Sequence, residues 1–271
     1  MNATLRLWDG YKHTSPHLRE AVVELQHKLT SHGLKTSADG FFGYGTQELV
    51  EQFQESKGLV VDGVVGPQTW SAFNGTTPPE TYLFETTYER RNPDLLKQLV
   101  VARKYEDDLY QAAIHAGVHQ SVLFGIGSRE SRWGLGLTPP GPHGTGDFAK
   151  RSNRKPFRKN STPDDGGGFG RGIWQIDYDW HEFARTGNWK DASANIAYGA
   201  HVLRDHYEQL RREVKLDEMA LLRASIASYN CGVGNVMRAI VSGKGVDYYT
   251  AHRDYSRDVL SRAGWFQING W

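Results

Sequence analysis

SVLFGIGSRES (residues 121–131) is the stretch that decides how the larger part of this chain folds. Its first seven residues are apolar or small almost all round, which is typical of a helix that is buried on every side. Glu130 stands where this run ends and polar residues begin. A carboxyl group at the edge of a buried helix is partly desolvated, and desolvation favours its neutral, proton-donating form. The alternative is a surface glutamate that forms an ion pair with Arg129 or Arg132.

A glycine-rich segment, GFGRGIWQID (residues 168–177), predicts a short β-hairpin that lines a cleft. A helix is expected to begin at Ala192, because Leu203 and Leu210 continue its apolar face. SYNCG follows at residues 228–232. Together with the apolar run, these elements predict a mainly α-helical domain with a short β-hairpin at its cleft.

Four motifs occur in a fixed order along this part of the chain. They are Glu-Ser at 130–131, Gly-(apolar)-(apolar)-Gln-Ile at 172–176, Asn-Ile-x-x-Gly-x-x-x-Leu from Asn195, and (small)-Tyr-Asn-x-Gly from Ser228. In this order they resemble the lysozyme-like family that includes goose-type lysozymes and lytic transglycosylases. The resemblance spans residues 121–260, with Asp254-Tyr255 near its end, and it implies an enzyme that cleaves the glycan of the bacterial wall. The alternative from another class is a non-catalytic wall-binding protein that has kept the fold.

The resemblance also implies roles for single residues. Glu130 corresponds to the catalytic glutamate, which donates a proton to the oxygen between N-acetylmuramic acid and N-acetylglucosamine. Gln175 corresponds to a cleft residue, and Tyr229 and Asn230 correspond to residues near the glutamate and the sugar. An aromatic group accompanies the hairpin: Trp174, Tyr178, Trp180 and Trp189. Aromatic faces stack on sugar rings, so we expect one or two of these rings, with Trp174 as a candidate, to bind substrate and most to lie in the core.

Aspartates separate two possible reactions. Lytic transglycosylases of this family rely on the glutamate alone, whereas goose-type hydrolases add aspartates two residues after the motif glutamine and shortly before the Gly-Phe-Gly. Asp177 stands in the first place, and Asp164 or Asp165 in the second. This favours hydrolysis with inversion, in which Asp177 and one of the pair hold a water molecule. The sequence leaves open which of the pair acts, and both also fit an ordinary loop.

The N-terminal part contains a repeat. Asp-Gly-x-x-Gly-x-x-Thr occurs at residues 39–46 and again at residues 62–69, and an amphipathic helix is expected before the first copy. The pattern resembles the peptidoglycan-binding module of wall hydrolases over residues 15–75; the alternative is that the turns only join three helices of a small bundle. Phe41, Tyr44 and Trp70 are candidate ligand contacts, although Phe41 and Trp70 fit the core equally well.

These patterns predict three regions. A three-helix peptidoglycan-binding domain is expected at residues 1–75, a polar linker stiffened by two prolines at 76–90, and the lysozyme-like domain at 91–271. The Gly-, Pro- and then basic-rich segment 135–163 is longer than the family's usual connection. It fits a solvated loop; our hypothesis is that it borders the cleft and contacts an anionic wall polymer or a membrane surface.

The composition argues against nucleic-acid binding, disulfide bonds and a zinc site. The net charge is +1 over 271 residues, so no overall field favours nucleic acid. Cys231 is the only cysteine, which excludes an intrachain disulfide and a thiolate zinc cluster. His115 and His119 do not form the His-Glu-x-x-His pattern of a zinc peptidase. We therefore expect neither a metal nor an organic cofactor.

The start of the chain lacks an apolar signal core, and no stretch approaches the roughly 20 apolar residues of a membrane span. We expect a monomer that is made in a cytoplasm, without stable insertion in a membrane. It would reach peptidoglycan in the periplasm after release by a separate pore, as a phage endolysin does.

Overall fold

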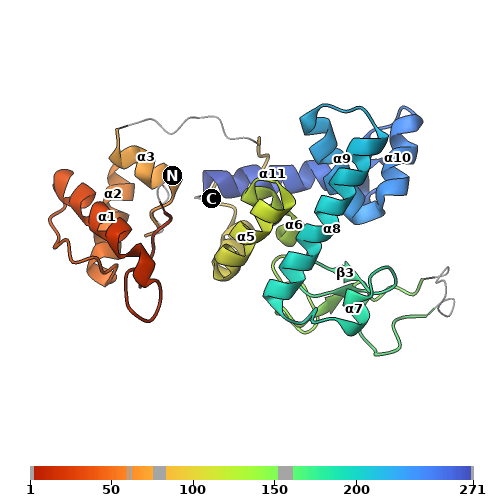
Figure 1. Ribbon diagram of the computed structural model, residues 1–271, viewed down its shortest axis with the longest axis horizontal. Helices are drawn as coiled ribbons and strands as arrows, with labels where there is room; N and C mark the ends of the chain where they lie inside the picture. The colour runs from red at the N-terminus through yellow and green to blue at the C-terminus, as the bar shows by residue number, and fades with distance from the viewer. Residues whose placement is uncertain (1–2, 60, 62, 76–83, 152–160, 270–271) are drawn as a thin grey trace. The chain divides into compact units, whose positions relative to one another are not determined.

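The computed structural model describes residues 3–59, 61, 63–75, 84–151 and 161–269 (Figure 1). They form two compact units: a smaller one made of the residues before Phe84 together with the end of the chain from Gln267, and a larger one that spans Phe84–Phe266. Helices dominate both units, which confirms the mainly α fold class. No helix among the described residues is long and apolar enough to cross a membrane.

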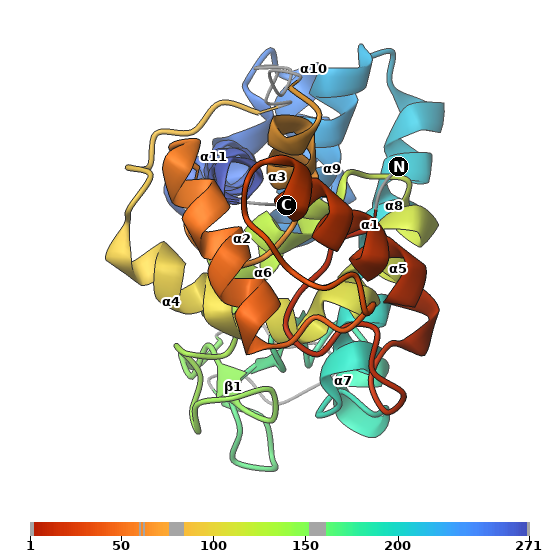
Figure 2. The same ribbon diagram turned by 90° about the vertical axis from the view of Figure 1, so that its left-hand side faces the viewer.

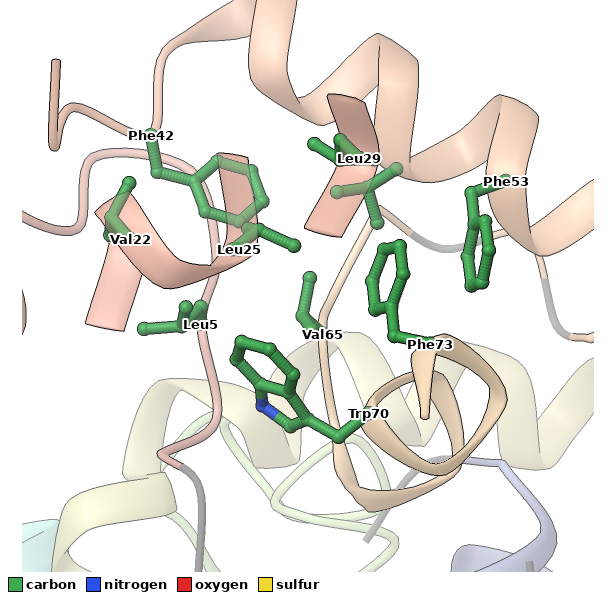
Figure 3. Packing of buried hydrophobic residues seen from close by; sticks show 10 residues of the cluster. Leu5, Val22, Leu25, Leu29, Phe42, Phe53, Val65, Trp70 and Phe73 are labelled. Carbon is green, nitrogen blue, oxygen red and sulfur yellow. The ribbon is translucent and has the colours of Figure 1, made fainter. Parts of the chain in front are cut away.

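Three α-helices build the N-terminal unit: α1 (Arg19–Ser31), α2 (Tyr44–Ser56) and α3 (Pro67–Phe73), with the short 3-10 turn η1 (Pro16–Leu18) before α1. Their apolar faces meet in one core with Leu5, Phe42 and Val65 of the connecting loops (Figure 3). Within this core the rings of Phe53 and Phe73 stack with centroids 3.8 Å apart. Trp70 is buried and its indole N–H donates to the carbonyl oxygen of Ala3 at 2.8 Å, so Trp70 is a core residue.

Each copy of the repeat is fastened by a buried glutamine from the preceding helix. Gln26 of α1 accepts a hydrogen bond from the amide of Gly40 (2.9 Å) and donates to the carbonyl oxygen of the next residue (3.2 Å). Gln54 of α2 repeats both contacts, with the amide of Gly63 (3.0 Å) and the carbonyl oxygen of Val64 (2.8 Å). The structural repeat is therefore longer than the sequence motif and includes a glutamine in the helix before each turn.

The larger unit is an assembly of helices with one small sheet. Its helices are α4 (Pro93–Ala102), η2 (Arg103–Tyr105), α5 (Glu106–Ala116), α6 (Gln120–Ser131), α7 (Phe183–Thr186), α8 (Ala192–Glu213), α9 (Glu218–Cys231), α10 (Val233–Val241), η3 (Val246–Tyr249), η4 (Ala251–Arg253) and α11 (Tyr255–Ile268). Helix α8 packs along both α5 and α9 (Figures 1 and 2). The sheet contains β1 (Thr145–Gly146), β2 (Gly170–Arg171) and β3 (Ile176–Asp177), all antiparallel in the order β1-β2-β3. The expected hairpin is thus β2-β3, and β1 adds a third strand.

Helix α6 is buried over residues 121–128, as its sequence predicts. Its glycines allow neighbours to approach the backbone: a Cβ on Gly125 would lie 2.3 Å from the carbonyl oxygen of Val259 in α11. A Cβ on Gly127 would lie 2.7 Å from the ring of Trp133, which folds back onto the helix after a left-handed turn at its C-terminus. This packing fixes the last turn of α6, where Glu130 is located.

The larger unit begins before the predicted boundary at residue 91. The amide of Thr87 donates to the hydroxyl of Ser261 (2.9 Å), and the indole N–H of Trp265 donates to the carbonyl oxygen of Glu89 (2.9 Å). Residues 84–90 are therefore attached to α11 and do not act as a linker. Residues 76–83, the rest of the predicted linker, lie outside the described chain.

Candidate active site

Glu130 lies in the last turn of α6 and is half-buried. The arginines beside it in the sequence bind other carboxylates. Arg129 contacts two aspartates at the start of α11, at 2.9 and 2.8 Å, and Arg132 forms its ion pair with Asp94 of α4. Glu130 is consequently not the surface ion-pair partner that the alternative interpretation required.

The surroundings of Glu130 favour its protonated form. Burial raises the pKa of Glu130 from 4.5 to about 7, although the hydrogen bond from Tyr255 and the charge of Arg129 act in the opposite direction. The Tyr255 hydroxyl donates to Oε1 of Glu130. Tyr255 is itself buried, and burial together with the nearby Glu130 raises its pKa well above the usual value, so it remains a neutral donor. A carboxyl group with a pKa near 7 is suited to donate a proton at physiological pH.

Tyr229 of α9 connects this carboxyl group to the hairpin. Its hydroxyl donates to the carbonyl oxygen of Trp174 at 2.9 Å, and burial, with the nearby Glu130 next in effect, raises its pKa well above normal. Trp174 is 0% exposed: its ring packs against Gly199 and edge-to-face on Tyr229, with centroids 6.0 Å apart. The expectation that Trp174 stacks on a sugar is therefore wrong, because the fold covers both faces of its indole.

Hydrogen bonds from helices α6 and α8 hold the turn between β2 and β3. The hydroxyl of Ser131, next to Glu130, donates to the carbonyl oxygen of Ile173 at 2.6 Å. Asn195 of α8 accepts from the amide of Trp174 (2.9 Å) and donates to the carbonyl oxygen of Arg171 (3.0 Å). The motif residues Ser131, Asn195 and Tyr229 thus fix the hairpin relative to Glu130.

Gln175 follows this turn in a left-handed backbone conformation, with φ of 50°. Its side-chain amide donates to the carbonyl oxygen of Gly172 at 2.8 Å. Its Oε1 lies over the sheet, where a Cβ on Gly146 or Gly170 would be 2.2 Å away. The side chain is therefore held against the sheet, and a substrate contact by Gln175 stays a prediction.

Asp177, at the end of β3, is bound by Arg151. The two guanidinium nitrogens of Arg151 donate to the two carboxylate oxygens, Nη1 to Oδ1 at 3.1 Å and Nη2 to Oδ2 at 2.6 Å. The same Nη2 donates to Asp147 at 2.7 Å, and the guanidinium lies 3.8 Å above the ring of Phe169. Arg151 lies within the segment 135–163 that was expected to be a solvated loop, and residues 152–160 of that segment lie outside the described chain.

Asp164 and Asp165 occupy the loop before β2. The Asp165 carboxylate accepts from the amide of Gly167 (3.1 Å) and from the buried Arg171 (2.8 Å). Partial burial would raise the pKa of Asp165, but these hydrogen bonds outweigh it and the pKa is lowered. Asp165 therefore anchors its loop to the sheet, whereas Asp164 is exposed. The carboxylates that share Arg151 with Asp177 belong to Asp147 and Asp179.

Two further predicted residues have clear positions. Asn230 is exposed, and its side-chain oxygen accepts from the amide of Ala251 at 2.9 Å, so it fixes the start of η4. In the aromatic group around the hairpin, Trp189 is buried but Trp180 is 79% exposed. Trp180, three residues after Asp177, is the member of that group whose ring is available to a sugar.

Tyr255→Phe is expected to move the alkaline limb of the pH–activity profile to higher pH. The hydrogen bond from the Tyr255 hydroxyl stabilises the ionised form of Glu130 and so lowers its pKa, against the effect of burial. Without this hydrogen bond, burial raises the pKa of Glu130 further. A hydrogen bond to a charged group contributes ~1.5–3 kcal/mol, which corresponds to a shift of about one pH unit or more. Tyr229→Phe is the matched control, because its hydroxyl bonds a carbonyl oxygen and not Glu130. An unshifted limb in Tyr255→Phe would show that this bond does not set the pKa of the acid.

Two family models match the chain. Residues 19–73 match the peptidoglycan binding domain family, and residues 148–270 match the Lysozyme g family. The chain therefore has a modular architecture that joins a peptidoglycan-binding domain to a lysozyme g domain, as the sequence motifs predicted.

Several known proteins are similar to this chain. Lysozyme g of Gallus gallus is 33% identical over 127 residues, which cover 46% of this chain and 56% of that protein. Lysozyme G of Dromaius novaehollandiae is 28% identical over 155 residues, which cover 57% of this chain and 61% of that protein. The chain thus spans less than two thirds of the length of these lysozymes. Spore cortex-lytic enzyme of Bacillus cereus is 47% identical over 51 residues, which cover 18% of this chain and 20% of that protein. A solved structure, that of Burkholderia AP3 phage endolysin, is 18% identical with a TM-score of 0.29, covering 98% of this chain and 97% of that one.

Proposed function

We propose that the chain is a peptidoglycan hydrolase of the muramidase type. Glu130 donates a proton to the glycosidic oxygen between N-acetylmuramic acid and N-acetylglucosamine. The observation that carries this proposal is a half-buried carboxyl group with a pKa of about 7 that accepts a hydrogen bond from Tyr255, while the neighbouring Arg129 and Arg132 form their ion pairs with aspartates. The match to the Lysozyme g family over residues 148–270 supports the same reaction class.

In this proposal Asp177 orients the attacking water. Each carboxylate oxygen offers two acceptor positions. Oδ1 of Asp177 uses both, for Arg151 and for the amide of Asp179, whereas Oδ2 uses one, for Arg151. The remaining position on Oδ2 can accept a hydrogen bond from water. Asp164 is the second candidate, since the carboxylate of Asp165 is engaged by Arg171.

Peptidoglycan is the proposed partner of both units, and the N-terminal unit anchors the enzyme to the wall. We further propose that the protein acts as a monomer in the periplasm after release through a separate pore. The chemistry assigned to Glu130 and Asp177 requires no metal or cofactor. Among the described residues, no three His, Cys, Asp or Glu side chains are grouped so that they could hold a metal ion.

A lytic transglycosylase is the second candidate, because Arg151 engages both oxygens of Asp177. In that reaction the C6 hydroxyl of muramic acid attacks in place of water. Mass spectrometry of digested sacculi distinguishes the two, since anhydro products are lighter by one water molecule. We expect reducing-end products; a digest containing only anhydromuramic ends would refute the hydrolase and leave Glu130 as the sole catalytic carboxyl group.

A further inference from the structure

The N-terminal unit carries a group of aromatic rings on its surface, here called the aromatic platform: Trp8, Tyr11, Phe41 and Tyr44. The indole of Trp8 lies edge-to-face against both tyrosines, with centroid distances of 5.4 Å to Tyr11 and 5.3 Å to Tyr44. Tyr11 lies 4.8 Å from Phe41, whose ring is covered by the guanidinium of Arg19 at 4.2 Å. Trp8 is 43% exposed and Tyr44 69%. Contiguous exposed apolar surface on a small soluble unit marks a binding site more often than chance exposure does.

The platform is built from the loop at residues 8–11, the first Asp-Gly turn and the start of α2, and backbone contacts join the loop to the turn. The amide of Trp8 donates to the carbonyl oxygen of Phe42 (2.8 Å). The amide of Phe42 in turn donates to the carbonyl oxygen of Asp9 (2.9 Å). Gly10 touches the first Asp-Gly turn so closely that a Cβ there would lie 1.9 Å from the carbonyl oxygen of Gly40. The backbone segments that carry the rings are therefore held together before any ligand arrives, which lowers the entropy cost of binding.

Trp8 has an unfavourable backbone conformation. Its φ of 76° lies in the left-handed region, which is strained for a bulky residue and comfortable for glycine. Thr14 holds the loop in this conformation. Its hydroxyl donates to the carbonyl oxygen of Trp8, and its amide donates to the carbonyl oxygen of Tyr11 at 3.2 Å. Strained residues that the surrounding structure maintains are concentrated at functional sites. Neither burial nor backbone preference accounts for a tryptophan here.

The two copies of the repeat show that the platform is not needed for the turn. Phe42 and its counterpart Val65 are both fully buried, so each turn requires an apolar residue at that position. Phe41 and Tyr44 correspond to Val64 and Pro67 in the second copy. The turn therefore forms with or without aromatic residues at these outer positions, and the first copy alone carries them.

We propose that the aromatic platform binds the glycan strand of peptidoglycan, with sugar rings stacked on Trp8 and Tyr44. This inference rests on the proposed function and names the site within the N-terminal unit that serves it. A pyranose ring presents C–H groups on its faces and polar groups around its rim, which matches an aromatic side chain with an apolar face and a polar tip. Within the described residues, no protein hydrogen bond occupies the hydroxyl of Tyr11 or Tyr44. Both hydroxyls are thus available to the acetamido and hydroxyl groups of a sugar.

The test uses the full chain in a Glu130→Gln background, so that the ligand is not degraded. Trp8→Gly and Tyr44→Ala are each expected to weaken binding to sacculi at least about tenfold, as truncation of aromatic anchor residues does at other binding sites. Trp8→Gly should still fold, because glycine adopts this φ without strain, and the Tm of the variant checks that it does. Tyr110→Ala is the matched control: Tyr110 is 55% exposed but belongs to α5 of the larger unit.

A local measurement separates the platform from the active site, which also binds glycan. In protein labelled with 5-fluorotryptophan, the fluorine resonance of Trp8 is assigned through Trp8→Phe, and chitotetraose is then titrated. A saturable shift of this resonance is expected. If the parent protein binds sacculi but Trp8→Gly binds equally well and the resonance does not move, the platform inference is overturned and the proposed function survives. If the parent protein fails to bind sacculi, the proposed function itself fails.

Sacculi stripped of stem peptides by an amidase complete the test. Retained binding to this naked glycan, lost in Trp8→Gly, supports the platform as a sugar site. Binding to intact sacculi that disappears when the peptides are removed would assign recognition to the peptide and would overturn the proposal.

Discussion

Glu130→Gln is expected to abolish the lysis of purified sacculi and to leave their binding intact. Glutamine keeps the size of the side chain and can still accept the hydrogen bond from Tyr255, but its amide is not acidic and cannot protonate the glycosidic oxygen. A positioned general acid contributes between about 10²- and 10⁴-fold to the rate. Turbidity clearance gives the rate, and pelleting with sacculi gives the binding. Glu218→Gln removes the same charge from an exposed position at the start of α9 and should leave both unchanged.

The stability of the same variant tests the environment of the carboxyl group independently. Burial raises the pKa of Glu130 from 4.5 to about 7, so between these values the unfolded chain releases a proton that the folded chain keeps. Stability therefore falls as the pH rises through this window, and above pH 7 the fold contains a poorly solvated carboxylate. Glutamine avoids this cost. The Tm of Glu130→Gln should exceed that of the parent at pH 8 and equal it at pH 4; a lower Tm at pH 8 would mean that Glu130 is well solvated.

Local patterns in the sequence were sufficient to predict the helices that matter for this site. The run at 121–127 predicted α6 correctly because a helix buried on all sides needs no polar stripe, and glycines within it indicate close neighbours. The segment 84–90 was misjudged because its polar composition resembles a linker. Its hydrogen bonds reach residues of α11 that are more than 170 positions away, and composition carries no information about such partners.

The candidate active site also depends on contacts between residues far apart in the sequence, which local patterns do not predict. Glu130 was found because its local environment changes within a few residues, whereas the donor Tyr255 lies 125 residues away. Trp174 and Trp180 are chemically identical neighbours of the hairpin, and only the fold decides that one is buried and the other 79% exposed. Arg151 lies in a basic stretch that the sequence predicts to be solvated, since a run of positive charge normally faces water. Its ion pair with Asp147 is local, but its ion pair with Asp177 joins residues 26 positions apart, which composition does not predict.

Asp177→Asn is expected to lower the hydrolysis rate about a hundredfold or more with little change in binding, within the range for general acid–base groups. Asparagine replaces one carboxylate oxygen by an NH2 group, which can donate a hydrogen bond but not accept one. Both oxygens of Asp177 accept from Arg151, and Oδ2 has the position proposed for water. The substitution therefore removes the negative charge that would orient and activate the nucleophile. The rate is measured on sacculi, and the reducing ends released are counted by mass spectrometry.

Asp147→Asn shows whether that loss reflects chemistry or the placement of Arg151. Asp147 accepts from the same Nη2 atom at 2.7 Å, so its substitution removes an equivalent ion pair and leaves Asp177 intact. If Asp177 holds the water, Asp147→Asn should retain most of the rate, because Arg151 is still fixed by Asp177 and by the ring of Phe169. Equal losses in the two variants would make Asp177 a positioning residue. A near-normal rate in Asp177→Asn, with anhydro products, would transfer the attack from water to the muramic acid C6 hydroxyl and leave the proton from Glu130 as the whole of the protein's catalytic chemistry.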